Sequence, residues 1–262
     1  MTDNQFAGRI AVVTGAGSGI GAATAKALAD RGARAVYLCD VNAAAAEAVA
    51  AEIEVGHPVG LDVSDSVAVA SAFATIVADQ GRIDVVVHAA GVDDPKSKQR
   101  MYDAAEKGEP IDILAHLEDD DWRRVMSINL DGTFFVLREA VRAMKPVGSG
   151  AIVTIGSSSG FDTLIGYPHY GASKAGVHAL SQSVAKEVAP FGIRVNTVAP
   201  GPVDTGMAAR TPAHLREAMA GSGARGYASP QELADNILYL ASDAAVNLVG
   251  VVLLSNGGRF TV

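Results

Sequence analysis

The stretch TGAGSGIG at residues 14–21 has the composition and spacing of a phosphate-binding loop. It follows the apolar run IAVV and opens the helical run GIGAATAKALADRG. Gly15 and Gly19 would let the backbone turn tightly beside a pyrophosphate, and Gly21 would let the helix pack closely on the strand. The helix N-terminus would then direct free N–H groups at the negative charge. No Lys-Ser/Thr pair follows, so the stretch predicts a dinucleotide site rather than a P-loop or a plain turn.

Asp40 follows these glycines by about twenty residues, at the end of the next apolar run. A carboxylate there can accept hydrogen bonds from both ribose hydroxyls and would repel a 2′-phosphate. Ser18, Val41 and Asn42 are the positions that could supply a counter-charge, and none of them is basic. Asp40 therefore favours NAD over NADP. A role as the N-cap of the helix that follows is the alternative for this residue, although Asn42 could also cap that helix.

Short apolar runs alternate with longer helical patterns along the chain, as expected for a parallel sheet whose two faces are covered. The predicted strands are 9–14, 35–40, 58–61, 83–88, 150–156, 194–198 and 249–254. The predicted helices are 20–31, 42–54, 65–80, 119–144, 170–191 and 230–242. This alternation predicts an α/β protein of the Rossmann type, a doubly wound seven-stranded parallel sheet with helices on both faces. We expect residues 1–262 to form a single domain, since the sequence contains no linker and no repeat.

Composition narrows the function classes. The 262 residues carry a net charge of −8 and no Lys/Arg cluster, which argues against a nucleic-acid partner. No apolar run is long enough for a membrane span, and MTDNQFAGR does not resemble a signal peptide. Cys39 is the one cysteine, which excludes an intrachain disulfide and fits a buried small residue in a cytoplasmic protein.

Further motifs follow in a fixed order: HAAG at 88–91, Asn129, Ser157, YGASK at 170–174 and PGPVDT at 200–205. Tyr-x-x-x-Lys alone is a weak signal, but here it stands in register with the glycine loop and with a serine thirteen residues earlier. In this combination the chain resembles a short-chain dehydrogenase/reductase from about residue 6 to residue 258. The resemblance implies hydride transfer between a nicotinamide and a CH–OH carbon.

The resemblance also implies catalytic roles for four residues. Tyr170 would be the general acid/base, and Ser157, rather than Ser158 or Ser159, would bind the substrate oxygen. Lys174 lies one helical turn from Tyr170, where its charge would favour the phenolate, and would hold the nicotinamide ribose. Asn129, within the predicted helix 119–144, would take part in a proton relay, unless it only caps or kinks the helix.

Cofactor contacts extend beyond the glycine loop in this family. The resemblance assigns them to Gly15, Ser18, Gly19, Ile20, Gly21, Asp40, Val41, Asp62, Val63, Ala89, Ala90, Gly91, Tyr170, Lys174, Pro200, Gly201, Val203 and Thr205. Asp62 would bind the adenine amino group, although Asp62 or Ser64 could instead cap the next helix. His88 stands where the family often has asparagine, and we expect it to be structural. Asn256 stands where aspartate is usual.

Two segments are expected to shape the substrate site. One is the charged insertion 92–117, in which 97–107 could form a short helix and which could instead be a solvated surface segment. The other is a lid at about 203–228. Phe161, Leu164, Ile165 and Tyr167 together with lid residues Met207, Leu215 and Met219 predict a mostly apolar pocket. A hydrophobic alicyclic, aromatic or steroid-like alcohol would suit it, whereas Arg210, Arg216 and Arg225 could read a carboxylate or an acyl carrier.

Three functions remain open from the sequence: an NAD-dependent dehydrogenase of a hydrophobic alcohol, a 3-oxoacyl-thioester reductase of the same fold, and a non-catalytic dinucleotide sensor. Asp40 without a nearby base argues against the second, and the set Ser157, Tyr170 and Lys174 argues against the third. No metal site is predicted, because the six histidines are scattered. The resemblance also implies a homotetramer that pairs the helices 119–144 and 170–191, with Val177, Leu180, Val184 and Val188 either at that interface or in the core.

Overall fold

The computed structural model describes residues 4–209, 211–213, 216–217 and 225–262. Its centre is one parallel sheet of seven strands in the order β3-β2-β1-β4-β5-β6-β7. The strands are β1 (Ile10–Thr14), β2 (Ala35–Asp40), β3 (Gly56–Gly60), β4 (Val85–His88), β5 (Gly150–Ile155), β6 (Ile193–Pro200) and β7 (Val252–Ser255). Strand order reverses between β1 and β4, and in such sheets ligands bind beyond the carboxyl ends of the strands at this point.

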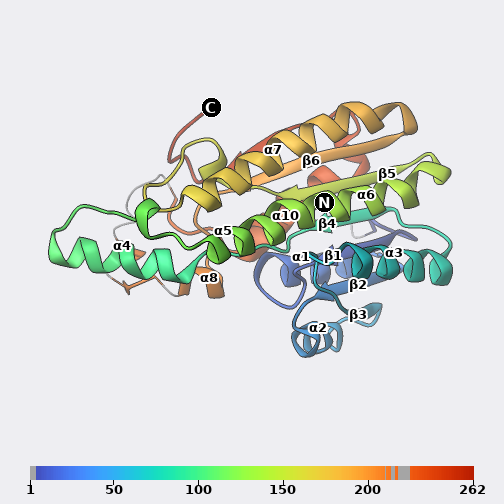
Figure 1. Cartoon of the computed structure of the whole chain (residues 1–262). Helices are drawn as coiled ribbons and strands as arrows, with labels where there is room; N and C mark the ends of the chain where they lie inside the picture. The colour runs from blue at the N-terminus through green and yellow to red at the C-terminus, as the bar shows by residue number, and fades with distance from the viewer. Residues whose placement is uncertain (1–3, 210, 214–215, 218–224) are drawn as a thin grey trace.

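Helices cover both faces of the sheet (Figure 1). On one face lie α1 (Gly19–Asp30), α2 (Ala43–Ala50) and α10 (Pro230–Ala241). On the other lie α3 (Ser66–Gln80), α6 (Gly132–Met144) and α7 (Pro168–Val188). Successive residues of β1 show why: Val13 joins the first apolar cluster and Val12 the second. Side chains of a strand alternate between faces, so a strand that is covered on both sides must be apolar throughout.

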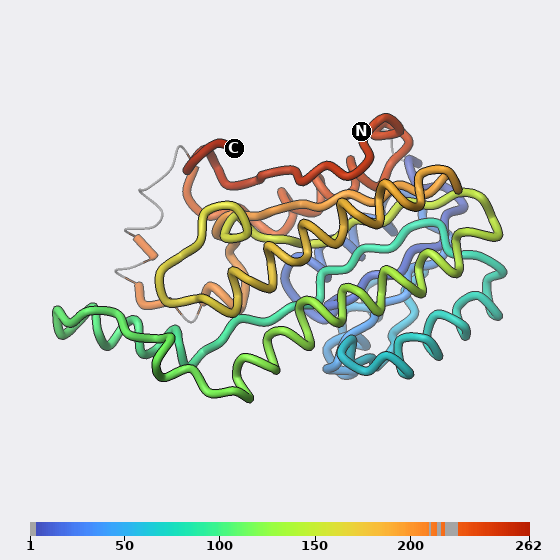
Figure 2. Tube along the Cα trace, turned by 45° about the horizontal axis from the view of Figure 1, so that its top comes forward, coloured from blue at the N-terminus to red at the C-terminus, as the bar shows by residue number. Residues whose placement is uncertain are grey.

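Three further helices of the described residues lie near the carboxyl edge of the sheet. They are α4 (Pro95–Lys107), α5 (Asp119–Met126) and the short α8 (Gly206–Ala209). Asp94 caps α4 by accepting from the amides of Lys96 and Ser97, Pro95 occupies the first turn, and Gly108 ends it with a φ of +68°. Both views show α4 extending from the body of the molecule at the end where the strands finish (Figures 1 and 2). The sequence predicts this helix only as 97–107.

Several predicted boundaries need correction. The predicted helix 119–144 is interrupted by a π-helical segment, Ser127–Asp131, between α5 and α6. The edge strand β3 begins at Gly56 rather than at 58, and β7 begins at Val252 rather than at 249. β3 and β7 are the two edge strands of the sheet, each with a single neighbour, and the sequence places the ends of such strands poorly.

The predicted apolar stripe on α7 is divided between the core and the surface layer. Val177 and Val188 are buried, whereas Leu180 and Val184 are half-buried and pack against the second cluster. Within the described residues, no helix combines the length and hydropathy that a bilayer crossing would need.

Candidate active site

The glycine loop is built by three close approaches. Gly15 has a φ of +65°, and a Cβ on it would lie 2.7 Å from the amide nitrogen of Ala90. A Cβ on Gly21 would lie 2.1 Å from the carbonyl oxygen of Gly15, so only glycine lets α1 start this close to the loop. Gly19, with a φ of +54°, faces Thr205, whose Cγ2 would lie 3.2 Å from an added Cβ. The loop therefore has the backbone geometry that a pyrophosphate site needs.

The N-terminus of α1 carries no side-chain cap. Ser18 stands at the N-cap, is exposed, and its hydroxyl accepts none of the first-turn amides. The amides at the start of α1, including that of Ile20, are thus not satisfied by Ser18, and together with the helix dipole they suit an anion.

Asp40 is fixed by two backbone amides. Its Oδ2 accepts from Gly17 N and its Oδ1 from Asn42 N, each at 2.9 Å. The helix cap is Asn42, whose side chain accepts from Ala45 N, so the capping alternative for Asp40 is wrong. The neighbouring Val41 is 74% exposed, so its side chain does not cover the Asp40 carboxylate. The carboxylate is held next to the glycine loop, where a ribose would lie.

The region expected to bind adenine has an exposed polar residue, Asp62, next to a buried apolar one, Val63. Asp62 is exposed, and its Oδ1 accepts from the amide and hydroxyl of Ser64. Neither residue caps α3, because Asp65 accepts from the first-turn amides of that helix. Val63 is buried against Gly132.

The residues after β4 approach the glycine loop and α7, the helix that carries Tyr170 and Lys174 and is called the catalytic helix below. Ala90 donates its amide to Thr14 Oγ1 at 3.2 Å, and Ala89 and Ala90 border the position where a Cβ on Gly15 would lie. A Cβ on Gly91 would lie 3.3 Å from both Asn129 Oδ1 and Lys174 Nζ. HAAG therefore connects the two halves of the candidate site.

Ser157 and Tyr170 are brought together by the turn after β5 and the first turn of α7. Ser157 is buried, its Oγ lies 2.7 Å from Ser159 Oγ, and it hydrogen-bonds the Tyr170 side chain. Burial raises the pKa of Tyr170 above its ordinary value, while the hydrogen bond with Ser157 lowers it and the charge of Asp93 raises it. We expected the Tyr170 pKa to be lowered. In the chain without a cofactor it is raised instead, because desolvation outweighs the hydrogen bond with Ser157.

Lys174 is buried beneath Tyr170. Its Nζ donates to the carbonyl of Ile155 at 2.8 Å and lies 5.9 Å from the centroid of the Tyr170 ring. Burial lowers the pKa of Lys174 to about 8. The ammonium therefore loses its charge only slightly above neutral pH, which makes Lys174 responsive to an anionic partner.

Asn129 lies in the π-helical segment, and its side chain binds two other elements. Val92 N donates to Asn129 Oδ1 at 2.8 Å, while Asn129 Nδ2 donates to Val92 O at 3.0 Å and to Ser173 Oγ at 3.1 Å. Inserting one extra residue per turn rotates Asn129 away from regular helical packing, as π segments often do at functional sites. Asn129 thereby links the insertion to the catalytic helix.

Two buried histidines, His88 and His178, lie next to the polar residues Thr14 and Ser157. His88 Nδ1 lies 2.8 Å from Thr14 Oγ1, and burial lowers the His88 pKa to about 3. His178 Nε2 accepts from Ser157 N at 3.3 Å, and burial lowers its pKa to about 4. Both rings are therefore neutral at physiological pH, and they support Thr14 and Ser157 by packing and by hydrogen bonding. Within the described residues no group of three potential metal ligands gathers.

The segment PGPVDT crosses the carboxyl end of β6. Pro200 and Val203 are buried, and Val203 pairs with Ala228 in an isolated bridge. A Cβ on Gly201 would lie 2.8 Å from the Cα of Asn256, so this turn packs directly on the segment after β7. Asn256 itself is buried and donates to Phe260 O at 2.9 Å, a bond that an ionised aspartate could not make.

Part of the insertion borders a hollow beside the loop 163–168. An apolar hollow of about 350 Å³ lies between Ile111, Ile113 and Leu114 of the insertion and the loop 163–168. Leu164, Ile165 and Tyr167 line it, whereas Phe161 contacts His178 with the rings tilted by 46° and their centroids 4.8 Å apart. Most of the second half of 92–117 is exposed, with Ile113 buried, so the surface segment and the role near the substrate both stay predictions.

The segment expected to form a lid contacts the insertion at two described residues, Met207 and Thr211. Lys98 donates to Met207 O at 3.2 Å, and Tyr102 hydrogen-bonds Thr211. Arg216 donates to Asp204 at 2.7 Å, and Arg225 lies 3.4 Å from Glu232 with its side chain 81% exposed, so recognition of a carboxylate by these arginines stays a prediction. The expected contributions of Arg210, Leu215 and Met219 lie outside the described residues.

Sequence reasoning missed the charged residues under the insertion. Asp93 and Asp94 are buried beside the catalytic helix, and His169 next to Tyr170 is buried as well. The stretch VDDP does indicate a helix start, because Asp followed by Pro is common at the first turn of a helix. Nothing local to the sequence places them against His169.

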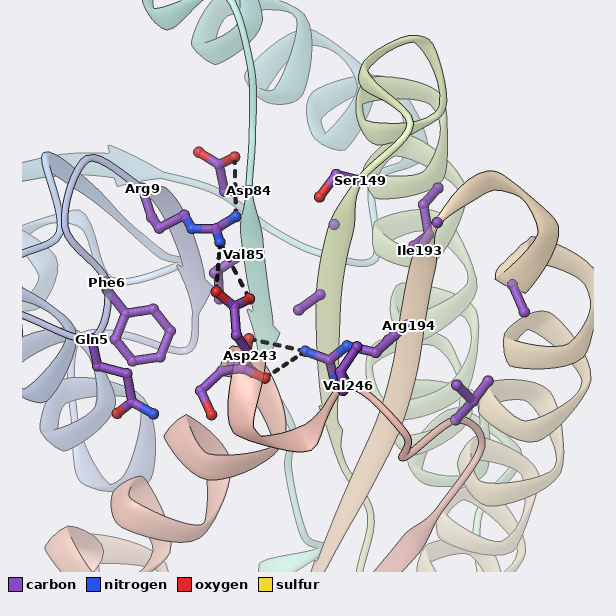
Figure 3. A pocket seen from close by; sticks show the side chains of 17 residues that line it. Gln5, Phe6, Arg9, Asp84, Val85, Ser149, Ile193, Arg194, Asp243 and Val246 are labelled. Atoms are coloured by element: carbon purple, nitrogen blue, oxygen red, sulfur yellow. Dashed lines mark hydrogen bonds and ion pairs between the residues drawn. The ribbon is translucent and has the colours of Figure 1, made fainter. Parts of the chain in front are cut away.

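Figure 3 shows a second pocket, of about 290 Å³. Val85, Gly150 and Ile193 line it, so it sits at the amino ends of β4, β5 and β6, opposite the candidate site. Arg9 crosses it to reach Asp84 and Asp243. The other arginine that lines it, Arg194, donates to four backbone carbonyls, those of Leu240, Ala241, Ser242 and Ala245, so the charged groups of this pocket already have partners within the chain.

Comparisons with known proteins agree with this geometry. The sequence model of the short chain dehydrogenases matches residues 9–216. The chain is 42% identical to cis-4-hydroxycyclohexanecarboxylate dehydrogenase of Sinomonas cyclohexanicum, with 98% of each chain covered. It is 36% identical to D-threitol dehydrogenase of Mycolicibacterium smegmatis, covering 98% of this chain and 94% of that one. It is 33% identical to the 3-oxoacyl-[acyl-carrier-protein] reductase FabG of Escherichia coli, covering 98% and 100%.

The fold has a solved counterpart as well. The crystal structure of gox2181 superposes with a TM-score of 0.85 at 31% identity, covering 97% of this chain and 96% of that one. Fold, motif order and sequence relatives point to the same class. The chain belongs to the short-chain dehydrogenase/reductase family and is an oxidoreductase of alcohols and ketones that uses a nicotinamide cofactor.

Proposed function

We propose that this protein is an NAD-dependent dehydrogenase of a secondary alcohol whose body is mainly apolar. The observation that supports NAD most directly is Asp40, whose carboxylate is fixed by the amides of Gly17 and Asn42 at the rim of the glycine loop. A 2′-phosphate at this point would meet a negative charge at close range, whereas ribose hydroxyls would donate to it. The exposed neighbours Ser18 and Val41 supply no positive charge.

The residues present fit this cofactor. The pyrophosphate would lie on the amides of Gly19, Ile20 and the first turn of α1, and the ribose of the adenosine on Asp40. The remaining expected contacts would come from Gly15, Gly21, Val41, Asp62, Val63, Ala89, Ala90, Gly91, Pro200, Gly201, Val203 and Thr205. Bound oxidised nicotinamide would supply the hydride acceptor and a positive charge.

Tyr170, Ser157 and Lys174 would then perform the proton chemistry. During oxidation the Tyr170 oxygen takes the proton of the alcohol, while the Ser157 hydroxyl donates to the developing carbonyl oxygen. Because burial raises the pKa of Tyr170, the phenol stays protonated in the chain without a cofactor. A nearby positive charge would be needed for Tyr170 to act as a base. Lys174 would contribute that charge, and Asn129 would help a proton relay that runs from Lys174 to water.

The hollow beside Tyr167 supports an alicyclic substrate. Its lining by Ile111, Ile113, Leu164 and Ile165 gives apolar contact without a fixed charge. The relative from Sinomonas cyclohexanicum acts on a hydroxylated cyclohexane ring, as its name states. We therefore place cyclohexanol derivatives first among the alcohols to be tested.

We further propose that the whole chain works as one domain, with 92–117 as a substrate-side insertion and about 203–228 as a lid. A homotetramer in the cytoplasm fits the half-buried Leu180 and Val184 on α7 and the single cysteine. Burial raises the pKa of the Cys39 thiol to about 12, so this cysteine is inert.

A substrate panel tests the proposal. Purified protein is assayed with NAD and with NADP against cyclohexanol, cis-4-hydroxycyclohexanecarboxylate, a hydroxysteroid, D-threitol and galactitol, following the absorbance of the reduced cofactor. Acetoacetyl thioester with each reduced cofactor tests the reductase alternative. NAD-dependent oxidation of a cyclic alcohol with the highest kcat/KM is the expected result. Preference for NADP, or a thioester reduced faster than any alcohol is oxidised, would refute it.

A further inference from the structure

His169 immediately precedes Tyr170 in the first turn of α7 and is completely buried. Its Nε2 lies 3.4 Å from Oδ2 of Asp94, whose side chain is 1% exposed. A buried histidine and a buried carboxylate thus meet beside the candidate acid/base, and none of the proton steps proposed above uses either of them.

Asp94 connects three elements. It caps α4, with Oδ1 accepting from Lys96 N at 3.1 Å and Oδ2 accepting from Ser97 N at 3.1 Å and Ser97 Oγ at 2.6 Å. Arg124 of α5 lies 3.8 Å from Oδ1. Burial alone would raise the pKa of Asp94, but these hydrogen bonds outweigh it and keep the pKa below its ordinary value. Asp94 is therefore a fixed anion at the root of the insertion.

The ring of His169 has no other partner among the described residues. Neither of its nitrogens makes an aligned hydrogen bond, although Nε2 is within ion-pair distance of Asp94. A buried imidazole that leaves its polar atoms unsatisfied costs free energy, and a small rotation of the ring would direct an N–H at Asp94. Hydrogen bonds of this kind are often long before substrate binds and shorten in the working complex.

We infer that His169 is a positioning residue for Tyr170, which it holds against Ser157 by binding Asp94 at the root of the insertion. This inference rests on the proposed role of Tyr170 as acid/base. His169 touches no reacting atom: it fixes the first turn of α7 to a carboxylate that α4 and α5 already hold. The charged groups that face it are Asp94, Arg124 and Asp121.

Two substitutions at His169 test the inference, with cis-4-hydroxycyclohexanecarboxylate and NAD as the assay pair. His169→Gln keeps a side-chain donor, whereas His169→Phe keeps the ring volume and loses the polar atoms. For His169→Phe we expect kcat to fall roughly 10-fold or more, as for a small misplacement of a reacting group, with the Kd for NAD unchanged. His169→Gln should recover part of that loss. His57→Gln, an exposed histidine on the edge strand β3, is the matched control.

The pH profile separates positioning from loss of folded protein. The hydrogen bond with Ser157 lowers the pKa of Tyr170, so a loosened Tyr170 should ionise at higher pH. In His169→Phe the rise of kcat/KM with pH should therefore move to higher pH, whereas a simple loss of active protein would leave its midpoint in place. An unmoved midpoint, or a kcat within twofold of the parent, would overturn the inference.

Asp94→Ser provides the second approach. Serine is also a good N-cap, so α4 should persist, but its side chain is too short to reach His169. We expect the same fall in kcat and the same shift of the pH profile as for His169→Phe, and a double variant no worse than either single one. Additive losses would contradict a shared contact. If Tyr170→Phe keeps full turnover, the proposed function fails; if only the His169 and Asp94 variants do, the inference alone fails.

Discussion

Replacement of Asp40 by alanine tests the cofactor assignment without knowledge of the substrate. The carboxylate is half-exposed and sits where the adenosine ribose would bind. Two unit charges about 4 Å apart interact by about 1 kcal/mol in water and about 4 kcal/mol at an effective dielectric constant of 20. For this half-exposed group we take about 1–2 kcal/mol as the repulsion of a 2′-phosphate, which is roughly 5- to 30-fold in affinity.

Loss of the ribose hydrogen bonds acts in the opposite direction on NAD. A hydrogen bond to a charged group is worth about 1.5–3 kcal/mol, so Asp40→Ala should weaken NAD roughly 10- to 100-fold. Together the two effects should lower the ratio of Kd for NADP to Kd for NAD by roughly 50-fold or more. The free energy of unfolding should fall by about 1 kcal/mol, because Gly17 N and Asn42 N each lose an acceptor.

Isothermal titration calorimetry with NAD and NADP measures both constants directly. Glu47→Ala is the matched control, because Glu47 is an exposed acid on the neighbouring helix α2 and its removal changes the net charge equally. If the ratio is unchanged in Asp40→Ala, or changes as much in Glu47→Ala, then Asp40 does not select the cofactor. Tighter binding of NADP than NAD by the parent protein would refute the reasoning at its start.

Three other outcomes are expected. Gly21→Ala should abolish NAD binding and lower the Tm, because its Cβ would lie 2.1 Å from Gly15 O; NAD titration and thermal melting check this, and a parent-like Kd would contradict the packing described. Tyr170→Phe should lower kcat roughly 100-fold or more while the Kd for NAD stays constant, and steady-state kinetics beside NAD titration decide it. Because the folded pKa of His88 is lowered to about 3, the unfolded chain binds more protons between about pH 6.5 and 3, so stability falls as the pH falls through this window. His88→Asn should flatten that dependence in urea unfolding at several pH values, and an equal slope in both proteins would exclude His88 as its source.

Sequence alone predicts the alternating elements and most of the site because these depend on local spacing. The glycine loop, Asp40 and the pair Tyr170 and Lys174 each lie at the end of a strand or within one or two helical turns, where the neighbours along the chain decide the geometry. The α/β class and the family are confirmed. The edge strand β3 and the limits of α4 were less predictable, since exposed elements carry a weaker apolar pattern.

What only the tertiary structure decided concerns residues far apart in sequence. The π-helical turn at Asn129 depends on packing against Val92 and Ser173, which no local pattern encodes. The direction of the Tyr170 pKa shift depends on how deeply the assembled elements bury its hydroxyl, so the charge expected from Lys174 does not decide it. The contact between Asp94 and His169, 75 residues apart, likewise exists only because the insertion folds back onto the catalytic helix. Spacing along the chain therefore selects the chemistry, and burial and long-range contacts decide how its groups are held.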